Sequence, residues 1–364
     1  MLITRTRVIV ATALAVAAVV AAATPSSAAT NDPLHEKQWG LQQIRAEAAW
    51  PASDGAGAVI AVLDTGVDTG HPELSGKLVG GATFTGCGKG QSPCGNGDWK
   101  GPDGDGAPDD VHGTHVAGIA AAATGNGTGI AGVAPSAKIM SVKVLEAGSG
   151  SYSEIAAGIR YAADHGADVI NMSLGGLAGT QVLPIVGIAD EMSQAIAYAV
   201  DKGVAVVSAA GNSATPLCSD PAFTDDAMCV VATDRNETKT WYSEHGVKPD
   251  LKVVSAPGGA GLVACDDDVW SAVPRGTGSS ACGRSDYDAY AGTSMATPHV
   301  AGVAALLAAQ GRSLENIYSV LMSTARTPGD AARGVYTPEY GWGIVDAEAA
   351  TAAAGATSGG KSRR

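Results

Sequence analysis

Residues 59–68 read VIAVLDTGVD, five apolar residues followed by an aspartate and a turn that contains a glycine. A short, continuous apolar run of this kind is typical of a strand buried on both faces of a parallel sheet. Comparable runs recur along the chain, at residues 138–144, 169–172, 204–207 and 230–232. Segments with helical spacing of their apolar residues accompany these runs, at 153–165, 188–202 and 314–325. This alternation predicts an α/β fold with a doubly wound, mostly parallel sheet and helices on both faces.

The composition fits one large globular domain. The chain has 364 residues, of which 45% are hydrophobic but only 5% aromatic, and it contains 49 glycines. We therefore expect a core of Ala, Val, Ile and Leu with close backbone approaches. The formal charge of −13 argues against the basic surface of a nucleic-acid binder, so no nucleic acid is expected as a partner. We find no repeat and no linker, and we assign residues 30–350 to a single domain and 351–364 to a disordered basic tail.

The first 29 residues have the pattern of a secretory signal peptide. Two arginines, Arg5 and Arg7, precede an apolar run at 8–23, and small residues follow at 26–29. The apolar run is shorter than the roughly 20 residues that span a bilayer, which argues against a membrane anchor. We therefore expect cleavage of residues 1–29, a secreted, extracellular protein, and no membrane contact after cleavage.

The six cysteines fit an oxidising destination, because all of them lie in Gly-, Ser- or Asp-rich sequence that reads as loops. Six cysteines allow fifteen pairings in principle. Short loops favour neighbours in sequence, so the expected pairs are Cys87 with Cys94, Cys218 with Cys229, and Cys265 with Cys282. A metal cluster is not expected, since the chain has no CxxC knuckle and no nearby histidine pair.

Three motifs with chemically active side chains stand in the order Asp, His, Ser. Asp64 ends the first apolar run and so lies at the carboxyl edge of the predicted sheet, where open α/β sheets place their ligand crevices. The segment HGTHVAG at 112–118 opens an apolar stretch, so His112 is predicted at a helix start. In GTSMATPHVAG at 292–302, Pro298 suits a first helical turn, which predicts Ser294 near a helix N-terminus.

These three side chains have the chemistry of nucleophilic catalysis. A serine hydroxyl such as that of Ser294 is a weak nucleophile unless a base accepts its proton, and the neutral imidazole of His112 is a base near neutral pH. A buried carboxylate, here Asp64, fixes the imidazole tautomer and stabilises the imidazolium that forms. The segment AAGN at 209–212 offers the amide of Asn212 as a donor to an oxyanion, and the Ser294 backbone N–H offers a second.

At these motifs the chain resembles the subtilisin-like serine proteases, the subtilases or peptidase S8 family, in their secreted bacterial form. Recognisable similarity extends from NDP at 31–33 and QWG at 38–40 to GWGIVD at 341–346. The resemblance implies a secreted serine endopeptidase that cleaves proteins through an acyl-enzyme intermediate. It assigns the base to the first histidine of HGTHVAG, which makes His115 a packing residue. Asp68, beyond the glycine turn, is expected at the surface.

The resemblance also implies a cleft that binds a protein or peptide substrate as an extended strand. The segments GSGSY at 148–152 and SLG at 173–175 resemble its two sides. The pocket for the residue before the cut would have its floor near 218–229, where the similarity fades, so no side-chain preference is predicted. A monomer is expected. The predicted substrate-binding residues are Gly148, Gly150, Tyr152, Ser173, Leu174, Gly175, Ala210 and Gly211.

Structural Ca²⁺ is the implied cofactor. The segment TGNGTGI at 124–130 resembles the calcium loop of the family, and two acidic positions elsewhere match carboxylate ligands. Glu73 departs from the family, which more often has Asp there. The predicted ligands are Asp32, Glu73, Thr124, Asn126, Thr128 and Ile130. A further acidic group is open to two interpretations, a second ion site or a solvated loop, and comprises Asp98, Asp103, Asp105, Asp109 and Asp110.

There are three alternatives to a general protease. A lipase or esterase of the α/β-hydrolase fold would need a GxSxG elbow and the order Ser, acid, His, and the sequence has neither. The second alternative is an inactive subtilase-fold binding protein, and the third is a processing protease dedicated to one secreted precursor. Because the mature-like start at 31–33 follows the leader directly, we also expect no pro-segment, with folding helped by calcium and the disulfides.

Overall fold

The computed structural model of the chain describes residues 30–87, 92–102, 104–175, 191–248, 250–261 and 264–354. The predicted signal peptide at 1–29 and the tail from residue 355 onward lie outside the described residues. No helix in the described part is long and apolar enough to cross a membrane.

The core of the fold is a seven-stranded sheet in the order β2-β3-β1-β4-β5-β6-β7, and every strand pair in it is parallel. Strands β2 and β3 lie on one side of β1, with β3 next to β1 and β2 at the edge, and strands β4 to β7 follow in order on the other side. The direction of the connections therefore reverses between β1 and β4. The strands are β1 Val59–Asp64, β2 Leu78–Thr83, β3 Lys138–Lys143, β4 Val169–Met172, β5 Ala205–Ala209, β6 Met228–Thr233 and β7 Val253–Pro257.

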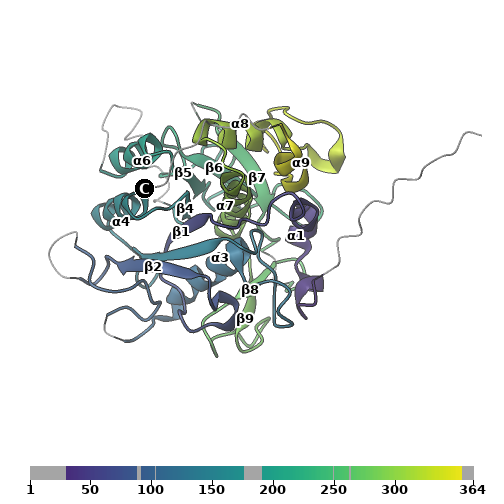
Figure 1. Cartoon of the computed structure of the whole chain (residues 1–364). Helices are drawn as coiled ribbons and strands as arrows, with labels where there is room; N and C mark the ends of the chain where they lie inside the picture. Colours follow the sequence, from purple (N-terminus) through teal and green to yellow (C-terminus); the bar gives the residue numbers. More distant parts are fainter. Residues whose placement is uncertain are drawn as a thin grey trace, which may run out of the picture.

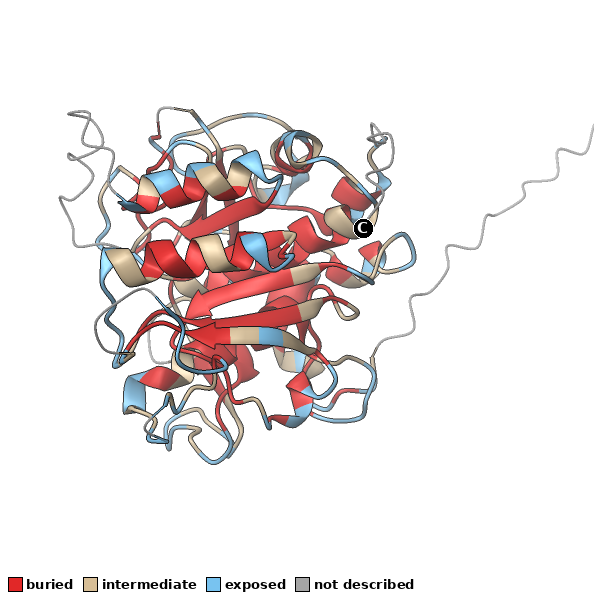
Figure 2. Cartoon of the chain, turned by 60° about the vertical axis from the view of Figure 1, so that its left-hand side comes forward, coloured by how far each residue is buried: buried red, intermediate tan, exposed pale blue. Residues whose placement is uncertain are grey.

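Helices cover both faces of this sheet (Figure 1). Alternate residues of β1 supply the two cores: Ile60 and Val62 pack on the side of α3 and α7, whereas Ala61 and Leu63 pack on the side of α4 and α6. Figure 2 shows the strands buried between the two helical layers, except for the edge strand β2, whose first four residues are intermediate or exposed. The helices are α1 Trp39–Gln43, α2 Ala46–Ala49, α3 His112–Ala121, α4 Tyr152–Asp164, α6 Glu191–Asp201, α7 Thr293–Ala309, α8 Leu314–Thr324 and α9 Ala347–Ala352. The predicted fold class is therefore confirmed.

The structure departs from the sequence expectations in some elements. Strand β2 was not predicted, because Gly80 and Gly81 interrupt its apolar pattern. Strand β7 was also missed, as was a two-stranded antiparallel sheet formed by β8 Val269–Ala272 and β9 Tyr287–Tyr290. Pro298 lies inside α7 rather than in its first turn, since the helix already begins at Thr293. Helix α9 extends to Ala352, two residues past the predicted domain boundary.

The three disulfides join cysteines that are neighbours in sequence, which are the predicted pairs. The closed loops are short, with sequence separations of 7, 11 and 17 residues. Each cross-link restricts the unfolded chain and so stabilises the folded one. The pairs are Cys87–Cys94, Cys218–Cys229 and Cys265–Cys282.

Candidate active site

The last residue of β1 and the first residue of α3 form the centre of the site. Asp64 is fully buried, and its Oδ1 lies 2.8 Å from Nδ1 of His112. The backbone N–H of Thr65 donates to the same oxygen at 2.7 Å and helps to fix the carboxylate. Burial lowers the pKa of His112, but the negative charge of Asp64 and its hydrogen bond outweigh burial and hold that pKa above its usual value. The outer side of the ring remains accessible, with 27% of the side chain exposed.

Ser294 is the second residue of α7 and faces the same cleft as His112. Its hydroxyl donates to the carbonyl oxygen of Ser173 at 3.2 Å. Its own carbonyl oxygen would normally accept the N–H of residue 298 in the helix, but Pro298 has none. The Ser173 hydroxyl donates to that oxygen instead, at 2.8 Å, so two reciprocal bonds connect the start of α7 to the segment after β4.

Asn212 follows β5, and its side chain binds the first residue of α7, next to Ser294. Its Oδ1 accepts hydrogen bonds from the backbone N–H of Thr293 at 2.9 Å and from the Thr293 hydroxyl at 3.0 Å. A Cβ built on Gly292 would lie 3.6 Å from Nδ2 of Asn212 and 3.6 Å from the backbone nitrogen of Ser294. The Asn212 amide and the backbone N–H of Ser294 thus both lie close to Gly292, at the start of α7.

The cleft around these residues has a volume of about 960 Å³. Six of the eight predicted substrate-binding residues line it: Gly148, Gly150, Tyr152, Ser173, Leu174 and Gly175. The other two do not line the cleft, because Ala210 is fully buried and Gly211 contacts a segment behind it. Several apolar residues that line the cleft were not predicted, because apolar positions of this kind carry no distinctive sequence motif. They are Val111, Leu145, Ile155, Met192, Pro221 and Tyr290.

A buried ion pair beneath the site was also missed. The Lys143 ammonium is fully buried and lies 2.8 Å from Asp110 Oδ2 and 2.8 Å from the carbonyl oxygen of Thr65. The other oxygen of Asp110 accepts the backbone N–H of Ala147 at 2.8 Å. The pair thus links the residue after Asp64 to the loop that carries one side of the cleft. Asp110 is therefore neither an ion ligand of a further site nor part of a solvated loop.

The remaining acidic residues of that group form no metal cluster in the part of the chain that the structure describes. Asp98 accepts hydrogen bonds from the hydroxyl and backbone N–H of Thr69. Asp109 lines the cleft and Asp105 is exposed, while Asp103 lies outside the described residues.

Asp68 and His115, which lie close in sequence to the predicted catalytic Asp64 and His112, make other contacts. The expectation that Asp68 lies at the surface is wrong: it is buried, and its two oxygens bind Arg275, with Nε 2.7 Å from Oδ2. His115 is fully buried, stacks on Tyr290 with ring centroids 4.5 Å apart, and has its pKa lowered to about 3 by burial. Its ring therefore stays neutral and serves as packing.

The predicted calcium ligands come from three segments that meet at one place. The carboxylate of Asp32 accepts the backbone N–H groups of Gly125 at 2.8 Å, Asn126 at 3.0 Å and Gly127 at 3.2 Å. Oδ1 of Asn126 accepts the N–H of Thr128 at 2.7 Å. The loop thus directs its N–H groups toward Asp32, and these hydrogen bonds already satisfy both oxygens of the Asp32 carboxylate.

Glu73 is the candidate ligand with a free oxygen. It is fully buried, and its Oε1 accepts the N–H of Ile130 at 3.0 Å and the hydroxyl of Tyr287 at 2.8 Å. Among the described residues, its Oε2 has no hydrogen-bond partner. Burial raises the pKa of Glu73 to about 7. A buried, unpartnered carboxylate oxygen fits a cation ligand. The hydroxyl of Thr124 donates to the carbonyl oxygen of Ala122 at 3.1 Å.

This geometry agrees with the comparisons to known proteins. The Subtilase family model matches residues 55–343. The chain belongs to the subtilase family. Subtilases are serine-type endopeptidases, and this chain is one of them. It is 44% identical to Thermitase of Thermoactinomyces vulgaris over 299 residues. The aligned region covers 81% of this chain and 91% of Thermitase.

Other relatives match over a similar extent. Subtilisin Savinase of Lederbergia lenta is 39% identical over 317 residues, covering 86% of this subtilase and 98% of that protein. A solved structure of a protease from Pseudoalteromonas arctica matches with a TM-score of 0.74 at 34% identity, covering 89% of this chain and 99% of that chain. The fold and the family thus have independent support.

Proposed function

We propose that this subtilase is a secreted endopeptidase that hydrolyses peptide bonds through an acyl-enzyme intermediate formed on Ser294. In this proposal His112 is the general base and Asp64 orients it. The observation that carries the proposal is the 2.8 Å hydrogen bond between buried Asp64 and His112, with both His112 and Ser294 lining one cleft.

The proton transfers follow from the tautomer of His112. Because Nδ1 donates to Asp64, Nε2 is the basic atom of the neutral ring. As substrate binds, the Ser294 hydroxyl rotates from the Ser173 carbonyl toward Nε2, and its oxygen attacks the peptide carbonyl carbon while the proton passes to Nε2. The charge of Asp64 stabilises the imidazolium that forms.

The oxygen of the substrate carbonyl becomes negatively charged and accepts hydrogen bonds from the two proposed donors, Asn212 Nδ2 and the Ser294 N–H. His112 then gives its proton to the leaving amine, and the C–N bond breaks to leave an ester on Ser294. Water repeats the sequence, with His112 again as base, and the tetrahedral intermediate breaks down to the free acid and the free hydroxyl.

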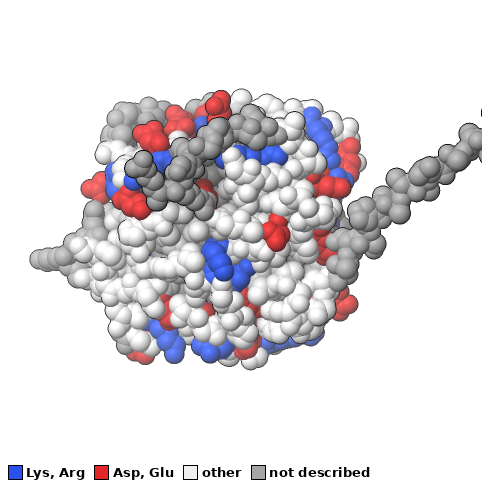
Figure 3. Space-filling view, viewed as in Figure 1, with Lys and Arg blue, Asp and Glu red and all other residues white. Residues whose placement is uncertain are grey.

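The substrate in this proposal is an extended protein or peptide segment that lies between the loop of Gly148 and Gly150 and the segment 173–175. Main-chain pairing on both sides would align the scissile bond over Ser294. We infer a monomer that acts outside the cell after removal of residues 1–29. On the face in Figure 3, Lys and Arg side chains lie interspersed with acidic and neutral ones. The proposal that no nucleic acid is a partner rests on the formal charge of −13.

A structural Ca²⁺ is the second part of the proposal. Glu73 would hold it through Oε2. Asp32 and Asn126 would have to exchange their bonds to backbone N–H groups of the 124–130 loop for bonds to the ion, and carbonyl oxygens of that loop would complete a hard oxygen set. The partnerless Oε2 of Glu73 supports this site. When bound, the ion would supply no chemistry and would stabilise the native state by mass action.

Calorimetry tests the metal. Millimolar Ca²⁺ added to chelator-treated protein should raise Tm, Mg²⁺ should raise it less, and Glu73→Gln should reduce the response to Ca²⁺. An equal Tm with and without Ca²⁺ in the wild type would remove the ion from the proposal.

Activity of Ser294→Ala tests the catalytic assignment. The variant should lose hydrolysis of a protein substrate while keeping its Tm, because only the nucleophilic oxygen is removed. Ser323→Ala, an exposed serine on α8, is the matched control and should keep full activity. Substantial residual activity in Ser294→Ala would refute the proposal. Cleavage of many unrelated proteins by the wild type would distinguish a general protease from one dedicated to a single precursor.

A further inference from the structure

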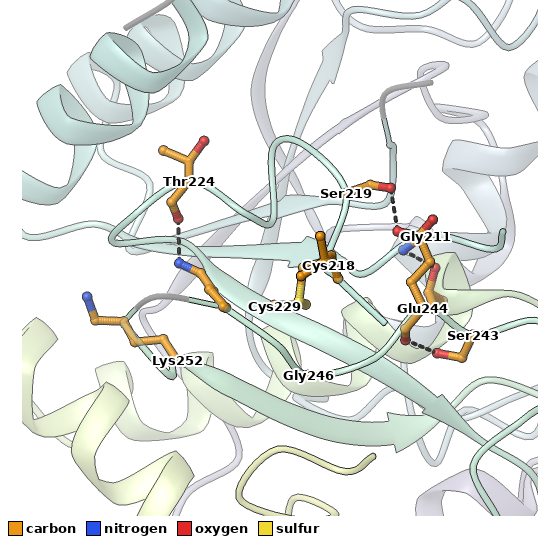
Figure 4. The surroundings of a disulfide bond; sticks show 12 residues. Gly211, Cys218, Ser219, Thr224, Cys229, Ser243, Glu244, Gly246 and Lys252 are labelled. Carbon is orange, nitrogen blue, oxygen red and sulfur yellow. Dashed lines mark hydrogen bonds between the residues drawn. A yellow bond between two sulfur atoms is a disulfide. The ribbon is translucent and has the colours of Figure 1, made fainter. Parts of the chain in front are cut away.

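A carboxylate lies fully buried beside the proposed oxyanion asparagine, and the mechanism does not use it. Glu244 follows the β6 strand in sequence and is held by its backbone N–H, which donates to the carbonyl oxygen of Gly211 at 2.9 Å. Its Oε2 accepts a hydrogen bond from the hydroxyl of Ser219 (Figure 4). Its Oε1 has no hydrogen-bond partner among the described residues.

No cation neutralises this carboxylate within the described part of the chain, where none of the ion pairs includes Glu244. The two lysines nearest in sequence have other partners. Lys239 Nζ donates to backbone carbonyl oxygens, including that of Ser243 at 3.2 Å, and Lys248 Nζ lies 2.8 Å from Asp250. A buried carboxylate with one hydrogen bond and no counter-charge is unfavourable unless a cationic partner arrives.

The position of Glu244 relates it to the substrate. Gly211 directly precedes Asn212 and has φ of +113°, a region that favours glycine. A Cβ at this position would collide with Oε2 of Glu244 and lie 2.8 Å from the Ser219 hydroxyl oxygen. The carboxylate therefore packs directly against the backbone of the 210–212 segment, one residue from the proposed oxyanion donor, Asn212.

The loop between Cys218 and Cys229 also contacts the 210–212 segment. The backbone N–H of Ser219 donates to the carbonyl oxygen of Ala210 at 2.7 Å, and Ser219 is adjacent to Cys218 of the Cys218–Cys229 bridge (Figure 4). Pro221, two residues further on, lines the cleft. The loop that carries Ser219 thus continues from the buried carboxylate to the cleft wall, at the place expected for the floor of the pocket that binds the residue before the cut.

We propose that Glu244 gives this pocket a negatively charged floor, so that the enzyme cleaves preferentially after Arg or Lys. This inference rests on the proposed function. The long side chain of Arg or Lys would extend past Pro221 at the cleft wall, and its charge would bind Glu244 at the unpartnered Oε1 or through the Ser219 hydroxyl. An apolar residue such as Phe leaves the carboxylate without a counter-charge, and an acidic residue is repelled.

Peptides that differ only in the residue before the scissile bond test the inference, with Arg, Lys, Phe, Leu and Glu at that position. For the wild type, kcat/KM for Arg should exceed that for Phe by about tenfold or more, in line with the strength of close charge pairs. Glu244→Gln keeps an acceptor for the Ser219 hydroxyl but removes the charge. It should lower the Arg-to-Phe ratio by about tenfold while the Phe value changes by less than about threefold.

The matched control is Glu315→Gln, which removes an exposed charge on α8 and should leave every ratio unchanged. A wild type without preference for basic residues, or an unchanged ratio in Glu244→Gln, would overturn the inference. A wild type that cleaves none of the peptides or proteins would instead overturn the proposed function. Inhibition of the wild type by matched peptide aldehydes is a second test that needs no folded variant. The arginine aldehyde should bind about tenfold tighter than the phenylalanine one, and equal binding would refute the charged floor.

Discussion

Asn212 allows two functions of one side chain to be separated by substitution. Its Oδ1 anchors the start of α7 through the backbone N–H and hydroxyl of Thr293, at 2.9 and 3.0 Å, whereas its Nδ2 is the proposed donor to the oxyanion. Asn212→Leu removes both the acceptor and the donor. Asn212→Asp keeps the acceptor for Thr293 but replaces the donor with an oxygen.

The magnitudes follow from these contacts. Loss of one oxyanion donor lowers kcat by about 10² to 10³, or about 2.7–4 kcal/mol, a range that comes from a subtilisin. Loss of the acceptor leaves the backbone N–H of fully buried Thr293 without a partner, whereas the Thr293 hydroxyl still accepts the N–H of Gly211. The free energy of unfolding should therefore fall by about 1–3 kcal/mol. Asn212→Leu should therefore lose both activity and stability. Asn212→Asp should lose at least as much activity but far less stability, because it keeps the bonds to Thr293.

The assay combines kcat and KM on a chromogenic peptide with denaturant unfolding of the same preparations. KM should change little in either variant, since the donor acts mainly on the charge that develops in the transition state. An active Asn212→Asp enzyme, or an Asn212→Leu enzyme that differs mainly in KM, would show that Asn212 is structural rather than an oxyanion donor.

Two further substitutions test the charges around the site. Asp64→Asn removes the negative charge and the charged hydrogen bond that raise the pKa of His112, whereas the burial that lowers this pKa remains. The acid limb of the pH profile of kcat/KM should therefore move to lower pH. An acid limb at the same pH as in the wild type would contradict the electrostatic argument. Asp110→Asn leaves the buried Lys143 ammonium without its counter-charge, so denaturant unfolding should report a loss of about 3–5 kcal/mol, and a loss below about 1 kcal/mol would refute the importance of the pair. The exposed pair broken by Asp164→Asn is the control and should change stability little.

The sequence predicted the elements whose signals are local. Strand β1 was predicted from a continuous apolar run, and Asp64 from the residue that ends it. Where glycines interrupt that signal, as in β2, the strand exists only because its neighbour β3 pairs with it. Pro298 was a misleading local signal: it belongs inside α7, because the Ser173 hydroxyl replaces the missing helix partner of the Ser294 carbonyl.

The features that were missed depend on distant contacts. Lys143 sits in a strand, where a lysine ordinarily indicates a solvent-facing position, yet Asp110 reaches it from another segment and allows it to be buried. Asp68 was expected at the surface because its partner, Arg275, is 207 residues away. Glu244 carries no motif at all, and only the hydrogen bond of its backbone N–H to the carbonyl oxygen of Gly211, 33 residues away, brings it beside Asn212. Such long-range juxtapositions need the fold.

The central claim is that Ser294 is the nucleophile activated by His112 and Asp64. The most direct measurement is mass spectrometry of the protein after reaction with a serine-directed fluorophosphonate, with peptide mapping of the adduct. We expect one adduct per chain, on Ser294, together with complete loss of peptide hydrolysis. In His112→Ala we expect no adduct over the same time. An adduct on another serine that abolishes activity, or full hydrolysis by a protein labelled at Ser294, would contradict it.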